Sequence, residues 1–225
     1  MKLLFTSLNG RWIEAIETLF QDSDTFCGDI QNIPRENTTF VSPANCLGFM
    51  DGGIDLVYSR KMFPGCEQTV RQTIRDIGLQ TLLGRPYLPI GSAFGIPVGE
   101  TTNLICAPTM FLPHDVSDTR NAYHSCLAAL LCWKKMESDT TLVFTSHCCG
   151  YGKMDEEESA RQMCDAYDDF LSDRIPIDTS ERSDVVLLPL VNDQQPNNYD
   201  NREIKDMSIV ELMKNAPVKT VHIHS

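Results

Sequence analysis

Two spacings of hydrophobic positions alternate along residues 1–171. Short apolar runs typical of buried strands cover residues 2–7, 25–30, 38–43, 90–98, 103–111 and 140–145. Between them, apolar residues recur every three or four positions, which predicts helices over residues 12–20, 55–79, 119–136 and 156–171. Pro64-Gly65 should break the second of these helices in two. This alternation predicts an α/β fold, a three-layer α/β/α sandwich around a mixed central sheet.

The composition changes after Leu171, which divides the chain into a domain over residues 1–171 and an extension over residues 172–225. The extension holds one strong apolar run, residues 184–191, followed by a stretch rich in Asn, Asp, Gln and Pro over residues 192–201. This pattern predicts a partly flexible segment that adds one edge strand or provides a surface for a partner.

The charge of the chain narrows the class of partner. With 31 acidic and 19 basic residues, the formal net charge is −12, which argues against a nucleic-acid-binding surface because phosphate neutralisation needs clustered Lys and Arg. No apolar window has the length of a membrane span, and residues 1–5 are too short for a signal peptide. We therefore expect an intracellular protein, cytoplasmic or nuclear, that does not act on membranes.

The nine cysteines are odd in number and lie inside strand and helix patterns. This distribution favours buried free thiols over disulfides. The run His147-Cys148-Cys149 could ligate zinc, but the sequence has no C-x-x-C partner for it, so we expect no metal site and no cofactor.

Two glycine-rich loops follow strand patterns and precede helices. The first runs from Ser42 to Asp55, and the second covers residues 150–153. Glycines let backbone N–H groups approach a phosphate or a sugar closely, and ligands in open α/β sheets lie beyond the carboxyl ends of the strands. Asn45 and Asp55 bracket the first loop and offer an amide and a carboxylate, which can orient hydroxyls and activate a water.

These motifs resemble the macro domains, the ADP-ribose-binding modules of the Appr-1-p processing family. The first loop reads S-P-A-N at residues 42–45 and G-G-I-D at residues 52–55, where the family has N-A-A-N, a glycine run and V-D. Gly28-Asp29-Ile30 matches the family's G-D-I, and residues 150–153 precede a helix as the second loop does there. The resemblance covers roughly residues 1–171 and is closest to divergent macro-like proteins with S-P-A-N in the first loop.

The resemblance implies a ligand, ADP-ribose or an ADP-ribosylated substrate, and a role for each motif. Asp29, beside Ile30, would accept a hydrogen bond from the adenine amine. Asn45 would orient the distal ribose, and Asp55 or Asp51 would position or deprotonate the attacking water. The two loops would contact the ligand through Ala44, Gly48, Gly52, Gly53 and Ile54 on the first and Cys149, Gly150, Tyr151, Gly152 and Lys153 on the second.

Each assignment has a structural alternative. Asp29 could cap a turn, Asn45 could bind its own backbone, and Asp55 could be a helix N-cap. The remaining alternatives are a surface turn for Asp51, a packing anchor for Tyr151 and a solvated side chain for Lys153. A hydrogen-bonded structural role for His147 is favoured over a general acid.

Three functions remain open from the sequence. The first is a hydrolase that removes a substituent from C1″ of the distal ribose, either an ADP-ribosyl ester or the phosphate of ADP-ribose 1″-phosphate. The second is a non-catalytic reader of free or protein-attached ADP-ribose, and the third is a fold with another nucleotide or no ligand. The Asn45 and Asp55 pair favours catalysis, since a reader needs no carboxylate to activate water.

Overall fold

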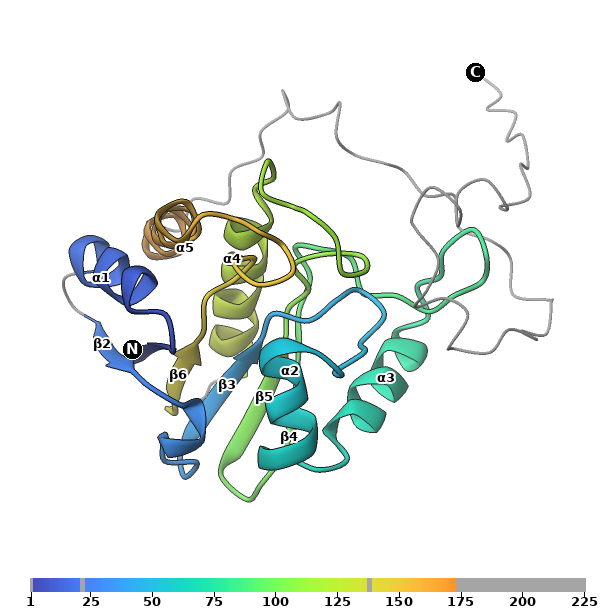
Figure 1. The fold of residues 1–225 in the computed structure, drawn as a ribbon. Coiled ribbons are helices and arrows are strands. Elements are labelled where there is room, and N and C mark those ends of the chain that lie inside the picture. Colours follow the sequence, from blue (N-terminus) through green and yellow to red (C-terminus); the bar gives the residue numbers. More distant parts are fainter. Residues whose placement is uncertain (1, 21–22, 137–138, 173–225) are drawn as a thin grey trace.

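The computed structural model describes residues 2–20, 23–136 and 139–172 (Figure 1). It confirms the three-layer α/β/α sandwich with a mixed sheet, whose six strands lie in the order β2-β1-β6-β3-β5-β4. The predicted extension lies outside the described residues, apart from Ser172. The strands are β1 Leu3–Ser7, β2 Asp24–Cys27, β3 Thr38–Ser42, β4 Phe94–Pro97, β5 Thr102–Cys106 and β6 Thr141–Phe144.

Five helical segments and two short turns cover the two faces of the sheet (Figure 1). α1 Gly10–Leu19, α4 Asn121–Lys135 and α5 Glu156–Leu171 share one apolar core. The other face carries α2 Gly53–Val57, the π-helical turn η2 Tyr58–Met62 and α3 Cys66–Ile77, together with the 3-10 turn η1 Ile30–Asn32. The predicted break at Pro64-Gly65 separates η2 from α3, where Gly65 has a φ of 94°.

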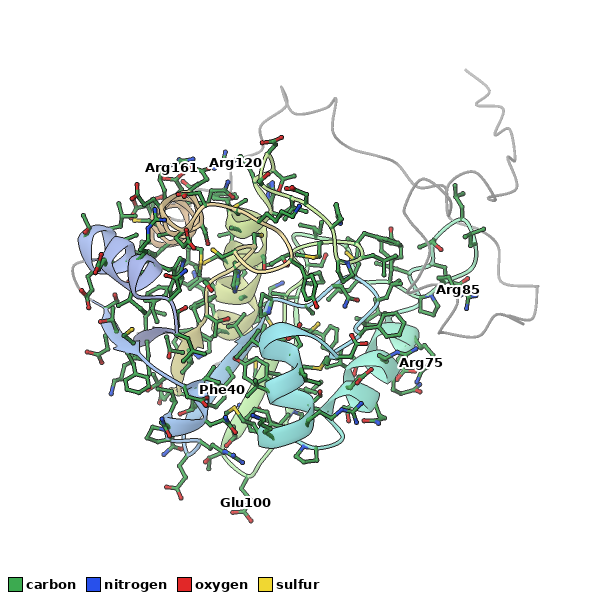
Figure 2. All side chains as sticks on the ribbon, in the orientation of Figure 1. Phe40, Arg75, Arg85, Glu100, Arg120 and Arg161 are labelled. Atoms are coloured by element: carbon green, nitrogen blue, oxygen red, sulfur yellow. The ribbon has the colours of Figure 1, made fainter. Side chains whose placement is uncertain are left out.

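Aromatic side chains fill both cores. On the first face the ring of Phe5 lies 4.5 Å from that of Phe20 and 5.7 Å from that of Phe144. On the second face the ring of Phe40 packs edge-on against Tyr58 at 6.0 Å. Figure 2 shows Phe40 inside the molecule, while Arg75, Arg85, Glu100, Arg120 and Arg161 lie at its periphery. The four central strands β1, β6, β3 and β5 are thus largely buried on both sides, as near-continuous apolar strands require. The edge strand β2 has no buried residue.

Three strands differ from their predicted runs by three or more residues at one end. The run over residues 90–98 forms a strand only at Phe94–Pro97, because the chain first turns at Gly91, whose φ is 83°. The run over residues 103–111 ends at Cys106, since Pro108 has no N–H for a ladder, and the chain turns toward the first loop, where Cys46 N donates to Met110 O at 2.8 Å. The run over residues 25–30 ends at Cys27, and Asp29 caps η1 instead.

Five of the six strands run in the same direction. β1 is parallel to β2 and β6, and β3 is parallel to β5 and β6, whereas β4 pairs antiparallel with β5. The carboxyl ends of the five parallel strands therefore meet at one edge of the sheet. The segments that follow them include both glycine-rich loops.

Candidate functional site

A cavity of about 840 Å³ lies at this edge of the sheet. All five parallel strands contribute to it, through residues at or after their carboxyl ends. Ser7 and Leu8 come from the end of β1, Asp29 follows β2, and the first loop follows β3. Residues 109–114 follow β5, and the second loop follows β6. A single open cavity therefore runs along most of the sheet edge.

Asn45 fixes the shape of the first loop. Its Oδ1 accepts from the backbone N–H groups of Leu47 at 3.1 Å and Phe49 at 3.2 Å, and its Nδ2 donates to the carbonyl of Phe49 at 2.8 Å. The side chain is buried. It has one N–H left for a ligand, so bracing the loop is its main role in this structure.

Side chains of α3 pack against the same loop. Gly48 has a φ of 72°, and an added Cβ would lie 2.7 Å from Ile74 Cδ1 and 3.1 Å from Val70 Cγ1. The Arg71 guanidinium lies 4.5 Å from the centre of the Phe49 ring. Gly48 is therefore a packing residue, and the loop is held rigidly where it passes the cavity.

Asp55 is a buried carboxyl in the cavity wall. It lies in the first turn of α2, whose N-cap is Gly52, so the N-cap alternative for Asp55 is wrong. Ser42 Oγ donates to Asp55 Oδ1 at 2.6 Å. Burial raises the pKa of Asp55 to about 7, with Glu67 adding to the rise and the Ser42 hydrogen bond opposing it. A carboxyl of this kind changes its charge near neutral pH.

The second loop needs glycine at one position. A Cβ on Gly152 would lie 2.4 Å from the carbonyl oxygen of Cys148 and 2.7 Å from Val116 Cγ2, whereas one on Gly150 would meet nothing within 4 Å. The flanking Cys148 and Lys153 have positive φ values of 65° and 53°. The loop is therefore a tight turn whose backbone faces the cavity at Gly150 and Gly152.

Tyr151 connects the two loops. Its Cε2 would lie 3.1 Å from a Cβ on Gly52, so the ring rests against the backbone of the first loop, and the side chain is 65% exposed. Tyr151 thus lies at the mouth of the cavity, where a ligand can reach it.

A third wall comes from the segment between β5 and α4. It joins the first loop through the Cys46–Met110 hydrogen bond and the second loop through Val116 N, which donates to Gly152 O at 3.0 Å. Asp115 also forms an ion pair with Lys153, with the Nζ and Oδ2 atoms 3.4 Å apart. The imidazole of His114 lies on this segment, among the residues that line the cavity.

The opposite end of the cavity is formed after β2. Asp29 Oδ1 accepts from the backbone N–H of Gln31 at 2.9 Å, and Oδ2 accepts from Gln31 Nε2 at 2.8 Å. These bonds hold the pKa of Asp29 below its usual value. Asp29 therefore caps η1, and it also lines the cavity, where its carboxylate oxygens retain further acceptor capacity.

Two solved structures share this architecture. The macrodomain of Mycobacterium tuberculosis DarG matches with a TM-score of 0.50 and 19% identity, over 63% of this chain and 86% of that one. The Oceanobacillus iheyensis macrodomain with MES bound matches with a TM-score of 0.52 and 17% identity, over 65% and 75%. This chain has the macrodomain fold. No protein-family model and no curated protein matches the sequence.

The cavity brings together most of the residues that the sequence analysis assigned. Asp29, Ile30, Ala44, Asn45, Asp51, Gly52, Gly53, Ile54, Asp55, Gly150, Tyr151 and Gly152 all line it. Three assigned residues lie outside its lining. Gly48 packs on α3, the thiol of Cys149 donates to the carbonyl of His147 at 3.4 Å, and Lys153 pairs with Asp115.

His147 differs from its expected role. It is fully buried beside Phe144, and neither ring nitrogen has a hydrogen-bond partner among the described residues. The expectation of a hydrogen-bonded histidine is therefore wrong. Burial lowers the pKa of His147 to about 3, so the ring is neutral and lies away from the cavity.

The thiols and the other possible metal ligands of the chain can be placed as follows. All nine cysteines lie in the described ranges and are free thiols. Over residues 2–20, 23–136 and 139–172, no group of three or more His, Cys, Asp or Glu side chains is arranged to hold a metal ion. Within the same part of the chain no helix has the length and apolar character needed to cross a membrane.

Sequence reasoning missed several cavity residues: Thr6, Ser7, Leu8, Thr109, Met110, Leu112, Pro113, His114, Thr145 and Ser146. Some of them carried a usable signal, because polar residues at the carboxyl ends of parallel strands, such as Ser7 and Thr145, are placed at the ligand edge by topology. His114 carried no such signal, since it follows an apolar run that resembles one long strand.

Proposed function

We propose that this macrodomain binds ADP-ribose derivatives and removes a substituent from C1″ of the distal ribose. Its substrate is either an ADP-ribosyl ester or ADP-ribose 1″-phosphate. The observation that carries the proposal is Asp55. A general base works best when its pKa is near the operating pH, and the pKa of this buried, cavity-lining carboxyl is raised to about 7.

The dimensions and backbone of the cavity support an elongated, anionic ligand. The cavity reaches from the segment after β2 to the segment after β5, which are four strand spacings apart, or about 19 Å at ~4.8 Å per strand. In its middle, the first turn of α2 has backbone N–H groups without intrahelical acceptors at Gly53 and Ile54. The diphosphate would lie there, with the adenine toward Asp29 and the distal ribose toward β5.

The chemistry assigned to Asp55 is proton removal from water. The water oxygen forms a bond to C1″, the bond from C1″ to the substituent oxygen breaks, and its electron pair leaves with that oxygen. The water proton passes to the Asp55 carboxylate. Ser42 Oγ donates a hydrogen bond to Oδ1 of Asp55. Oδ2 is therefore the oxygen that would accept the proton of the water. Asn45 is a positioning residue in this scheme, because it holds the loop on which Asp51 lies.

A reader function is the second candidate, and one observation favours it. Asn45 uses most of its hydrogen-bonding capacity on the loop. The Asn45 side chain therefore has fewer hydrogen bonds to offer a substrate than the predicted Asn45 and Asp55 pair requires. A reader would still need the glycine loops, but not a carboxyl that titrates near neutral pH.

Comparison of the wild-type chain with Asp55→Asn separates the two candidates, because a reader hydrolyses neither substrate in either form. The substituted amide keeps the size of the side chain and an acceptor for Ser42, but it cannot take a proton from water. We expect ADP-ribose affinity within about threefold of wild type and a loss of at least 100-fold in hydrolysis of an ADP-ribosyl ester or of ADP-ribose 1″-phosphate. If Asp55→Asn hydrolysed both substrates at the wild-type rate, the assignment of Asp55 would be wrong.

A further inference from the structure

Two threonines lie side by side in the wall of the cavity. β1 and β6 pair in parallel with Phe5 opposite Phe144, and the next residues, Thr6 and Thr145, continue this register at the carboxyl ends of the two strands. Both threonines line the cavity. Adjacent strands lie about 4.8 Å apart, which sets the approximate spacing of the two side chains.

Both threonine side chains point to the face of the sheet that α2 covers. Side chains alternate along a strand, and two residues before the threonines, Leu4 and Val143 pack in the core on that face. Ile54 and Val57 of α2 pack against the same core and also line the cavity. The threonines therefore form the floor of the part of the cavity that α2 bounds.

Neither threonine hydroxyl has a hydrogen-bond partner within the described part of the chain. Thr6 Oγ1 and Thr145 Oγ1 are both buried and unpaired, and the two residues are only 1% and 6% exposed. A buried polar group without a partner destabilises the fold, whereas a methyl group of the same shape does not. Two such hydroxyls at one point of a cavity therefore indicate a ligand that supplies the missing hydrogen bonds.

A rotation about χ1 can bring each hydroxyl to the surface of the cavity. Side chains in strands commonly adopt two χ1 rotamers, and a change of rotamer can exchange the positions of the hydroxyl and the methyl of a threonine. A ligand with hydrogen-bonding groups above this floor selects the rotamer that reaches it.

The proposed binding mode places the proximal ribose of ADP-ribose over this floor. The adenine lies toward Asp29, which follows β2, and the diphosphate lies at the first turn of α2, which follows β3. β1 and β6 are the two strands between β2 and β3 in the sheet. The proximal ribose, which joins the adenine to the diphosphate, therefore passes over the ends of β1 and β6.

The chemistry of this ribose matches that of the floor. Its 2′ and 3′ hydroxyls each donate and accept a hydrogen bond, as the two threonine hydroxyls do. The unprotonated ring nitrogens of adenine and the phosphate oxygens only accept. Of the ligand groups near the floor, the pair of ribose hydroxyls is thus the one that can satisfy both the hydrogens and the lone pairs of the threonines.

We propose that Thr6 and Thr145 bind the 2′ and 3′ hydroxyls of the proximal ribose and select a ligand that carries both. None of the loop motifs assigns a residue to this ribose. The inference rests on the proposed function and adds a binding subsite to it, because that function sets the order of adenine, ribose and diphosphate along the cavity. The two hydroxyls then destabilise the unliganded fold and strengthen binding.

The test is isothermal titration of the full-length wild-type chain with ADP-ribose and with two analogues that lack either the 2′ or the 3′ hydroxyl of the proximal ribose. The same titrations are run on Thr6→Val/Thr145→Val, which replaces both hydroxyls by methyl groups, and on Thr6→Ser/Thr145→Ser, which keeps them. Thr39→Val is the matched control. It removes a buried hydroxyl from β3 that already has a partner, Thr140 at 2.7 Å, and that lies outside the cavity lining.

We expect the wild-type chain to bind ADP-ribose about fivefold more tightly than either deoxy analogue. The Thr6→Val/Thr145→Val protein should bind ADP-ribose at least fivefold more weakly than wild type and should bind all three ligands within twofold of one another. The Thr6→Ser/Thr145→Ser protein should keep at least half of the wild-type preference on a logarithmic scale.

Melting temperatures separate a binding role from a structural one. Thr6→Val/Thr145→Val should melt about 2 °C or more above wild type, because two unpaired buried hydroxyls are removed. Thr39→Val should melt below wild type, because it breaks a hydrogen bond, and should keep the wild-type preference among the ligands. Weaker binding by a more stable protein is a combination that damage to the fold does not produce.

Three results would overturn this inference alone. They are equal binding of ADP-ribose and both analogues by the wild-type chain, an ADP-ribose affinity of Thr6→Val/Thr145→Val within twofold of wild type, or an unchanged preference in that protein. In each case ADP-ribose itself still binds, so the proposed function survives. Failure of the wild-type chain to bind ADP-ribose would remove the proposed function, and this inference with it.

Discussion

Ser42 Oγ donates a hydrogen bond of 2.6 Å to Asp55 Oδ1. The bond joins the last residue of β3 to the first turn of α2, and both side chains are buried. The position of Ser42 at the start of the first loop therefore influences the charge of Asp55, the carboxyl that we propose as the general base.

Ser42→Ala should raise the pKa of Asp55, because it removes the hydrogen bond that lowers it. If hydrolysis requires the deprotonated carboxyl, its rate rises with pH through that pKa. The midpoint of the rate profile, which we expect near pH 7 in wild type, should move upward by roughly one unit in Ser42→Ala. Rate measurements from pH 5 to pH 9 check this. A midpoint that stays in place would mean that the profile reports another group.

Asp55→Asn should stabilise the protein at high pH. The folded-state pKa of Asp55 is raised from 3.8 to about 7, so the folded protein binds the extra proton, and stability is lost as pH rises from about 4 through 7. The neutral amide does not suffer this loss. Urea unfolding should show an advantage of Asp55→Asn over wild type that is larger at pH 8 than at pH 4.5 by on the order of 2–4 kcal/mol. Parallel pH profiles for the two proteins would contradict a raised pKa.

Gly152→Ala should damage the second loop, and Gly150→Ala is its matched control. The added methyl at residue 152 meets the backbone oxygen of Cys148 at 2.4 Å, whereas the one at residue 150 meets nothing within 4 Å. We expect Gly152→Ala to cost about 1–3 kcal/mol of stability and at least tenfold in ADP-ribose affinity, with Gly150→Ala within twofold of wild type. Equal behaviour of the two variants would show that the turn relaxes without consequence.

Asn45→Ala should destabilise the first loop, since it removes three hydrogen bonds to the backbone of Leu47 and Phe49. We expect a loss of about 2–3 kcal/mol in the free energy of unfolding. Urea denaturation measures it without any ligand. Wild-type stability combined with lost binding would instead show that the Asn45 amide acts mainly on the ligand.

The sequence predicted α5 with the bounds that the structure has, because its signals are local. Apolar residues recur at helical spacing over residues 156–171, and Asp155 caps the first turn by accepting from the N–H groups of Glu157 and Glu158. The two glycine loops were also visible, since a strand pattern leads directly into each of them. Most of the assigned residues consequently line the cavity.

Long-range contacts account for what the sequence did not predict. Residues 103–111 read as one strand, and nothing in that run shows that the backbone of Met110 pairs with Cys46 rather than with the sheet. The position of His114 depends on that turn. The role of Asn45 could not be predicted for a different reason. An asparagine beside a glycine loop can bind either a ligand or its own backbone, and only the three-dimensional contacts distinguish the two.

Isothermal titration of the purified chain with ADP-ribose, with AMP as the control, tests the central claim most directly. In the proposed binding mode AMP would occupy the end of the cavity near Asp29, but AMP lacks the second phosphate and the distal ribose. We expect micromolar or tighter binding of ADP-ribose and at least tenfold weaker binding of AMP. Binding of neither ligand, or equal binding of both, would contradict the account.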